Sequence, residues 1–115
     1  MLIDHRTYRV RPLTLHKQLA LFNEHGFPVL KKYIGEPLGI FLPIDGDTNS
    51  YIHIWVFENY EDRARRRALM EKDAAWHAFL EKSASAGYLV HQESRLMTPS
   101  QLADVPRPRL APLNP

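Results

Sequence analysis

The segment Asn49–Phe57, NSYIHIWVF, constrains the fold of this chain more than any other stretch. Its β-branched and aromatic side chains are typical of a β-strand. A strand with one face in water alternates apolar and polar residues, whereas this segment has two largely apolar or aromatic rows. One row holds Ile52, Ile54 and Val56, and the other holds Tyr51, His53, Trp55 and Phe57. Both faces of the strand therefore need a cover.

The composition narrows the class of protein. The 115 residues fit one domain, and 44% of them are hydrophobic, which is enough for one packed core. The absence of cysteine excludes disulfides, thiolate catalysis and cysteine-based zinc sites. No apolar run reaches the roughly 18 to 20 residues of a membrane span, so we expect a cytoplasmic protein without a transmembrane segment. The net charge of +2 is too small to indicate nucleic acid as a partner.

Local patterns predict the element order β-α-β-β-α-β. Four strands are expected, at residues 2–11, 40–44, 49–57 and 88–97. Right-handed crossovers place the helices on one face of a four-stranded antiparallel sheet, with the first and third strands central. The sequence therefore predicts an α+β, ferredoxin-like subunit over residues 1–99. Residues 100–115 hold four prolines and no periodicity, which indicates an extended or disordered C-terminal arm.

The limits of the helices are marked by capping and breaking residues. Thr14 is expected to cap the first helix, which should kink at Gly26–Pro28. Asn59 is expected to cap the second helix, Asp73 to restart it and Gly87 to end it.

The two apolar rows of the third strand predict an assembly. Either row can meet the helices, and the other must point away. Tyr, Trp and Phe each bury roughly 150 to 250 Å², so three of them in water would exceed the roughly 300 to 600 Å² patch of a typical monomer. A second copy packed sheet to sheet is the economical cover. We therefore predict a homodimer, with the aromatic row turned into an interior shared by two subunits.

Four motifs, in this order along the chain, resemble the NIPSNAP family: Arg6-Thr-Tyr8, Asn49-x-x-x-His53-x-Trp55, Arg63 at the start of a helix, and Asp73-x-x-Trp76-x-x-Phe79. The resemblance covers the chain from about residue 3 to Pro99. It implies a dimeric α+β barrel built from two ferredoxin-like subunits. It implies no catalytic mechanism, although animal members are associated with mitochondria and vesicle traffic. The chain departs from the family form at Ala74, where Pro is expected, and at Arg11-Pro12-Leu13, which replaces a glycine turn.

The same motifs bring polar groups to one place. Asn49, His53 and Trp55 share one face of their strand, and Arg6 and Tyr8 share one face of the neighbouring strand. An arginine binds a carboxylate through two hydrogen bonds while aromatic side chains bury the rest of a ligand. We therefore predict a pocket inside the dimeric barrel for a small, partly apolar ligand with an anionic or carbonyl oxygen. Its expected lining is Arg6, Tyr8, Asn49, His53, Trp55 and Arg63.

Three functions remain open at this point, and with them the question of whether the chain is an enzyme. The first is ligand binding without a cofactor. The second is a cofactor-independent oxygenase or isomerase, with His53 as the general base and Arg6 holding an oxyanion or carboxylate. The third is a protein-interaction module whose barrel is filled by Tyr51, Trp55 and Phe57. A cavity within reach of His53 and Arg6 would favour the first two; in the plainest interpretation these two residues only satisfy buried polar groups.

The remaining polar patterns are interpreted as structural. His5, His53 and His91 fall on adjacent strands, but His5 has the wrong parity to join His53, so we predict no metal site. The arginine run at 63–67 is flanked by acids at three- or four-residue spacing, which favours a solvated, salt-bridged helix. Asp4 and Glu93 are interpreted as surface residues. Trp76 and Phe79 are interpreted as core.

Overall fold

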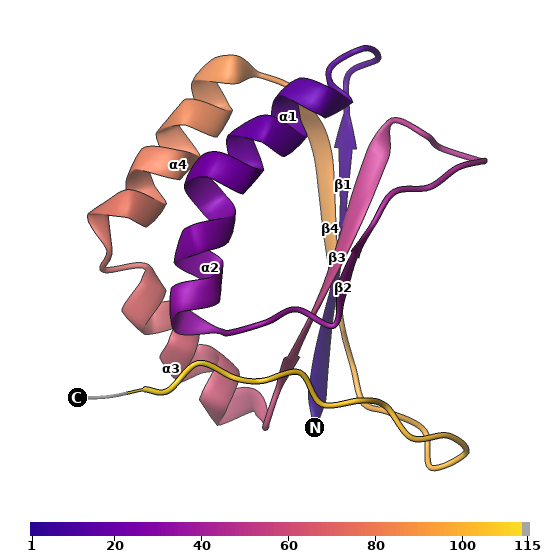
Figure 1. Ribbon diagram of the computed structural model, residues 1–115, viewed down its shortest axis with the longest axis vertical. Helices are drawn as coiled ribbons and strands as arrows, with labels where there is room; N and C mark the ends of the chain where they lie inside the picture. The colour runs from indigo at the N-terminus through magenta and orange to yellow at the C-terminus, as the bar shows by residue number, and fades with distance from the viewer. Residues whose placement is uncertain (114–115) are drawn as a thin grey trace.

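A four-stranded antiparallel sheet with every helix on one of its faces forms the chain, in a computed structural model that describes residues 1–113 (Figure 1). The strands are β1 (Leu2–Val10), β2 (Gly39–Phe41), β3 (Ser50–Phe57) and β4 (Leu89–Met97). Their spatial order, β2-β3-β1-β4, puts β1 and β3 in the centre. The predicted α+β, ferredoxin-like subunit is confirmed.

Two bent helical rods make up the second layer. The first rod consists of α1 (Leu15–Leu21), the π-helical turn η1 (Phe22–Gly26) and α2 (Phe27–Tyr33), and the second of α3 (Tyr60–Met70) and α4 (Ala74–Ala86). The turn η1 lies where a kink was predicted, because Pro28 has no N–H to continue the regular ladder. Across residues 1–113, none of the helices has the length and apolar character needed to cross a membrane.

Three of the four predicted end signals act as expected. Asn59 Oδ1 accepts a hydrogen bond from Asp62 N at 2.8 Å, and Asp73 Oδ1 accepts one from Ala75 N at 2.9 Å. Gly87 ends α4 with a φ of +66°, a left-handed conformation that suits glycine. The cap predicted at Thr14 is wrong, because its hydroxyl donates to the carbonyl of Arg11 at 2.6 Å instead of accepting from the helix.

The second strand is shorter than predicted. Pairing stops after Phe41, so the strand expected at 40–44 covers only Gly39–Phe41. Pro43 has no N–H to donate to a ladder, which explains why the edge strand ends before it. The segment beyond it carries Ile44, which is 96% exposed.

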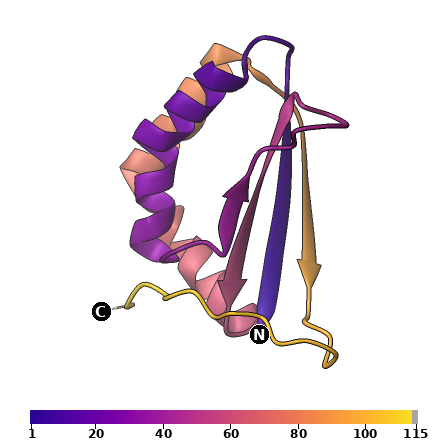
Figure 2. The same ribbon diagram turned by 45° about the vertical axis from the view of Figure 1, so that its right-hand side comes forward.

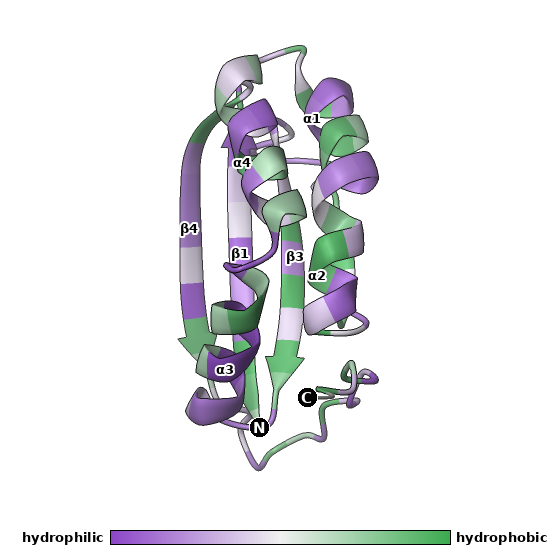
Figure 3. Ribbon diagram, turned by 90° about the vertical axis from the view of Figure 1, so that its left-hand side faces the viewer, coloured by the Kyte–Doolittle hydropathy of each residue, from purple (hydrophilic) through white to green (hydrophobic). Residues whose placement is uncertain are grey.

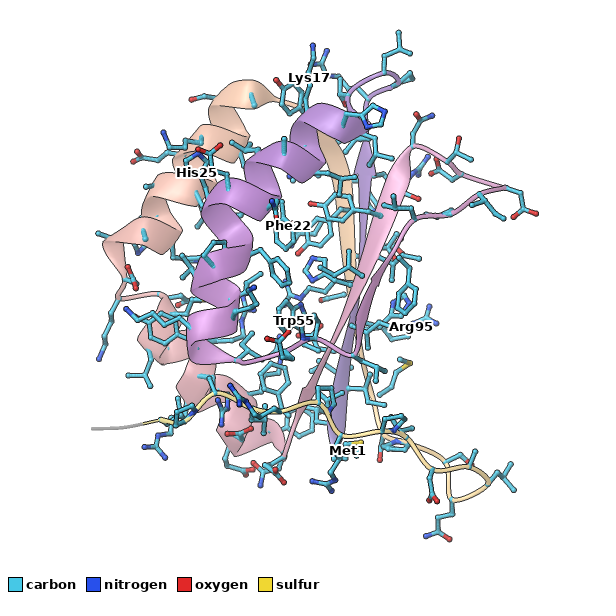
Figure 4. All side chains as sticks on the ribbon, in the orientation of Figure 1. Met1, Lys17, Phe22, His25, Trp55 and Arg95 are labelled. Atoms are coloured by element: carbon cyan, nitrogen blue, oxygen red, sulfur yellow. The ribbon has the colours of Figure 1, made fainter. Side chains whose placement is uncertain are left out.

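The aromatic row of β3 packs against the helices of its own subunit. Trp55 and Phe57 are each 1% exposed and belong to one core with Phe22 and Leu30. In Figure 4, Phe22 and Trp55 point into the space between the first rod and the sheet, whereas Arg95 points to the other side. The expectation that this row faces an interior between two subunits is therefore wrong. The first rod supplies Phe22 and Leu30 to this core and α4 supplies Phe79, so helices of the same subunit already cover the aromatic row.

The opposite face of the sheet carries the other row. Ile52 and Ile54 are half-buried, and their neighbour on β2, Phe41, is 49% exposed. All helices lie on the far side of the sheet in Figure 2, so no helix covers these residues. Ile52 and Ile54 thus lie on an open sheet face within the described chain, whereas Val56, at the end of the same row, is 5% exposed.

The described part of the C-terminal arm is docked on the helical layer. Leu110 forms a β-bridge with Gly35, and Ala111 N donates to Ile34 O at 2.8 Å. Arg66 Nη1 donates to the carbonyl of Ala111 at 2.7 Å. The arm is thus extended and held by its backbone in this stretch, while the end of the predicted arm, residues 114–115, lies outside the described residues.

Candidate functional site

A cavity of about 240 Å³ lies between the central strands and the helical layer. The sheet contributes its floor through the helix-facing residues Asp4, Arg6, Tyr8, Tyr51, His53 and Trp55. The helices contribute mainly Gln18, Phe22, Arg67, Trp76 and Phe79. The register of β1 and β3 explains the floor, because Asp4 pairs with Trp55, Arg6 with His53 and Tyr8 with Tyr51, which puts all six side chains on one face.

The cavity opens between α4 and β4. Among its lining residues, Leu80 on α4 is 43% exposed, Gln92 on β4 and Glu71 after α3 are exposed, and Ser83 is half-buried. The opposite wall is closed, with His53 and Trp55 at 2% and 1% exposure. Figure 3 shows β4 at the edge of the sheet beside α4. A ligand would therefore enter past α4 and meet His53 at the inner end.

His53 is held between aromatic rings at this inner end. Its ring stacks on Tyr8 at 4.8 Å between centroids and on Phe22 at 5.3 Å. Trp55 Nε1 donates a hydrogen bond to His53 Nδ1, whereas His53 Nε2 is buried without a partner. Burial, reinforced by the positive charge of Arg6, lowers the pKa of His53 to about 3. The imidazole is therefore neutral at physiological pH.

Asp4 forms the centre of a buried charge cluster. It is 1% exposed and accepts from Arg6 Nε at 3.1 Å and from Arg63 Nε at 3.0 Å. The interpretation of Asp4 as a surface residue is wrong. Its parity with Arg6 on β1 turns it towards the helices, and the two guanidinium groups offset the cost of burying its charge.

The arginine run of α3 is only partly solvated. Arg66 is 6% exposed, and Arg67 lines the cavity. Burial and the positive charges of Arg6 and Arg63 lower the pKa of Arg67. The predicted solvated helix is thus wrong for these positions. Their spacing from Met70, which is fully buried, places Arg63, Arg66 and Arg67 on the inward face of α3, a helical pattern that charge alone conceals.

Gln18 adds a second polar group without a complete set of partners. The side chain is fully buried, and its Nε2 donates to the Tyr51 hydroxyl oxygen at 3.2 Å. Its Oε1 has no partner. Burial raises the pKa of Tyr51, so this phenol stays protonated at physiological pH.

Four of the six predicted site residues line the cavity, namely Arg6, Tyr8, His53 and Trp55. Arg63 lies behind them, paired to Asp4. Asn49 is outside the cavity at the start of β3, where its carbonyl accepts from Val10 N at 2.8 Å. Sequence reasoning missed Gln18, Phe22 and Arg67 as site residues. The available signal was the helical spacing of Phe22 with Leu15 and Leu19, and of Arg67 with Met70.

No group of three or more His, Asp or Glu side chains suited to a metal ion occurs within residues 1–113. His5 pairs with Ile54 and Arg95 on the open face of the sheet, away from His53.

Known proteins are similar to this chain in sequence and in fold. The family model described as NIPSNAP matches residues 3–103. A NipSnap homolog of Dictyostelium discoideum is 35% identical over 97 residues, which are 84% of this chain and 42% of that protein, so the chain spans less than half of its relative. A crystal structure of a NIPSNAP family protein of unknown function from Agrobacterium tumefaciens is 30% identical, with a TM-score of 0.82 over 91% of this chain and 93% of that one.

A more distant structure shares the fold alone. A cofactor-independent oxygenase from Streptomyces nogalater is 16% identical, with a TM-score of 0.61 over 87% of this chain and 93% of that one. The family match, by contrast, covers nearly all of the described residues and includes the cavity floor on β1 and β3. The chain belongs to the NIPSNAP family.

Proposed function

We propose that this NIPSNAP protein binds a small, partly apolar molecule with an anionic or carbonyl oxygen in the cavity between its sheet and its helices. The observation that carries the proposal is the pair of buried, unpartnered polar atoms, His53 Nε2 and Gln18 Oε1, on two residues that line one aromatic cavity. A buried polar atom without a hydrogen bond costs about 1–3 kcal/mol. A ligand that supplies both partners would recover that free energy on binding.

The size and charge of the cavity support the same class of ligand. Ligand pockets commonly measure roughly 300 to 1,000 Å³, so about 240 Å³ suits a molecule of one or two rings. Arg6 and Arg67 bring positive charge to a lining that also holds Asp4 and Glu71, and Arg6 is paired with Asp4. Aromatic walls such as Phe22 and Phe79 suit an apolar body.

A thermal-shift screen of carboxylates, quinones and aromatic metabolites tests the proposal. Ser83→Trp places an indole in the cavity, and Ser85→Trp places one on the exposed side of the same helix as a matched control. We expect ligands that raise the melting temperature of the wild type and of Ser85→Trp but not of Ser83→Trp. Equal responses of all three proteins to every compound would overturn the proposal.

A second candidate function is a cofactor-independent oxygenase or isomerase acting in the same cavity. It is favoured by the register that places Arg6 directly opposite His53 on the cavity floor, where both can approach one ligand oxygen. Consumption of oxygen or isomerisation of a bound compound by the wild type, lost in Arg6→Ala, separates this candidate from binding alone.

We further propose that two copies pair through the open face of the sheet. Ile52, Ile54 and Phe41 lie on this face without a helix over them, and a second sheet packed at about 10 Å would cover them. In this assembly each subunit keeps its own cavity, because the cavity is on the opposite side of the sheet.

A further inference from the structure

We propose that Trp55 fixes His53 as a neutral hydrogen-bond donor, and that this donor binds the acceptor oxygen of a hydroxylated aromatic acid whose hydroxyl donates to Gln18. The inference rests on the proposed function of the cavity as a ligand site. It assigns the polar roles within that site and narrows the class of ligand.

The tautomer of His53 follows from its contact with Trp55. An indole nitrogen is only ever a donor, so the Nδ1 atom that receives it must present a lone pair. A neutral imidazole carries one proton, which must then reside on Nε2. If Nδ1 carried a proton, either in the other tautomer or in the charged ring, its N–H would face the N–H of Trp55 and the hydrogen bond would be lost. The unpartnered atom Nε2 is therefore an N–H donor.

The direction of this donor is fixed as well. The ring planes of His53 and Tyr8 differ by 4°. Phe22, which follows α1, stacks on the His53 ring with 5.3 Å between the two centroids. Tyr8 and Phe22 flank the ring and Trp55 holds its Nδ1 atom, so the ring cannot turn without breaking these contacts. The Nε2–H vector is thus preset before a ligand arrives, which lowers the entropic cost of binding.

The groups around His53 agree with a neutral ring. Arg6 and Asp4 face it from β1, and the phenols of Tyr8 and Tyr51 flank it. The first rod contributes the uncharged Phe22 and the Gln18 amide to this part of the cavity. His53 in this state cannot accept a proton through Nε2. A reaction in this cavity would use it to polarise a carbonyl, and would need a base elsewhere.

The ligand class follows from the complementary atoms. His53 Nε2–H requires an acceptor, and Gln18 Oε1 requires a donor such as a hydroxyl. The rings of Tyr8, Phe22 and Phe79 favour a flat aromatic body. An anionic group on that body would offset the positive charge of Arg67, which Arg6 and Arg63 repel and which Asp4 and Glu71 only partly balance. A hydroxylated aromatic carboxylate combines these features in a molecule of one ring.

The tautomer is tested on the free protein with ¹⁵N-labelled histidine. Long-range ¹H–¹⁵N spectra should show His53 as the neutral Nε2–H form throughout pH 8 to 5. In Trp55→Phe, which keeps a ring but removes the donor, we expect the Nδ1–H form to appear. A wild-type His53 in the Nδ1–H form, or charged at pH 5, would overturn the inference.

The ligand class is tested by calorimetric titration with benzoate and with 2-, 3- and 4-hydroxybenzoate. We expect at least one hydroxybenzoate to bind the wild type more tightly than benzoate does. His53→Phe should weaken the binding of this hydroxybenzoate about tenfold or more, and Gln18→Leu should abolish its preference over benzoate. His16→Phe, at an exposed position on α1, should change neither the affinity nor the preference.

The outcomes separate this inference from the proposed function. If compounds from the screen bind in the cavity but no hydroxybenzoate does, or if His53→Phe binds them as tightly as the wild type, the inference fails and the proposed function stands. If Ser83→Trp and the wild type respond equally to every compound, the proposed function fails, and the assignment of the ligand fails with it.

Discussion

Trp55 Nε1 donates a hydrogen bond to Nδ1 of His53, two residues away on the same face of β3. Both side chains are nearly inaccessible to solvent. This bond links the core of the subunit to the polar end of its cavity, since Trp55 packs with the core residues and His53 lines the cavity with its other nitrogen unpartnered.

Trp55→Phe should reduce the free energy of unfolding by about 1–3 kcal/mol, because it leaves the Nδ1 acceptor buried without a donor and removes core volume. Trp76→Phe is the matched control at the accessible mouth of the cavity, where a smaller loss is expected. Urea unfolding at pH 7 measures both variants. Equal losses would show that the hydrogen bond adds nothing to the stability of the wild type.

The free energy of unfolding should decrease as the pH is lowered, and part of this decrease should depend on His53. The pKa of this group is about 3 when folded, against 6.5 for an ordinary histidine, so below pH 6.5 the unfolded chain binds a proton that the folded chain does not. The contribution of His53 to the free energy of unfolding is therefore fully present above pH 6.5. It is lost at up to roughly 1.4 kcal/mol per pH unit as the pH falls towards 3.

The variant His53→Phe should show a shallower decline between pH 6.5 and 4.5, because one titrating group has been removed. Chemical unfolding at a series of pH values, compared with His16→Phe, isolates this contribution from that of the carboxylates. A slope as steep in His53→Phe as in the wild type would contradict the assigned pKa.

Gly35→Ala should release the C-terminal arm. Gly35 has a φ of +113°, and an added Cβ would lie 2.2 Å from the carbonyl oxygen of Arg109. Gly46→Ala is the control, because its φ of +69° is also positive but no atom lies within 4 Å of the added Cβ. In this control the free energy of unfolding should decrease by about 1–2 kcal/mol, from backbone strain alone.

Gly35→Ala should lower the free energy of unfolding by more than this control does. In limited proteolysis, its C-terminal arm should be cut faster than that of the wild type. An arm that stays equally protected in both variants would show that the contact between Gly35 and Arg109 does not hold it.

Ile54→Arg should separate the proposed dimer, because it buries a charge between the two sheets. Ile44→Arg makes the same substitution at an isoleucine that is 96% exposed in the loop after β2 and should leave the dimer intact. Light scattering at micromolar concentration should give about 27 kDa for the wild type and Ile44→Arg, which is twice 13.4 kDa, and 13.4 kDa for Ile54→Arg. A wild type of 13.4 kDa would refute the pairing.

The sequence predicted the topology because strands and caps are local signals: Asn59, Asp73 and Gly87 each mark a boundary through their own backbone chemistry. It also identified that Tyr51, His53 and Trp55 share a face. It did not identify which face, because alternation fixes only relative orientation when both rows of a strand are apolar. The aromatic row was therefore assigned to the wrong side of the sheet.

The charged part of the site was hidden for a related reason. Asp4 and Arg67 were interpreted as solvated because charged residues are seldom buried without partners. The partners of Asp4 are Arg63 on α3 and Arg6, two residues along β1, and only the packing of α3 on the sheet brings Arg63 and Arg67 close to Asp4. Gln18 carried no distinguishing pattern on its helix.

The most direct test of the central claim is a crystal structure of the protein with the tightest ligand from the screen or the hydroxybenzoate series. The ligand should lie between the sheet and the helices, with an acceptor oxygen about 3 Å from His53 Nε2 and with the Trp55 bond to Nδ1 intact. A ligand seated on the open face of the sheet, or one inside the cavity whose oxygens make no contact with His53, would contradict the account.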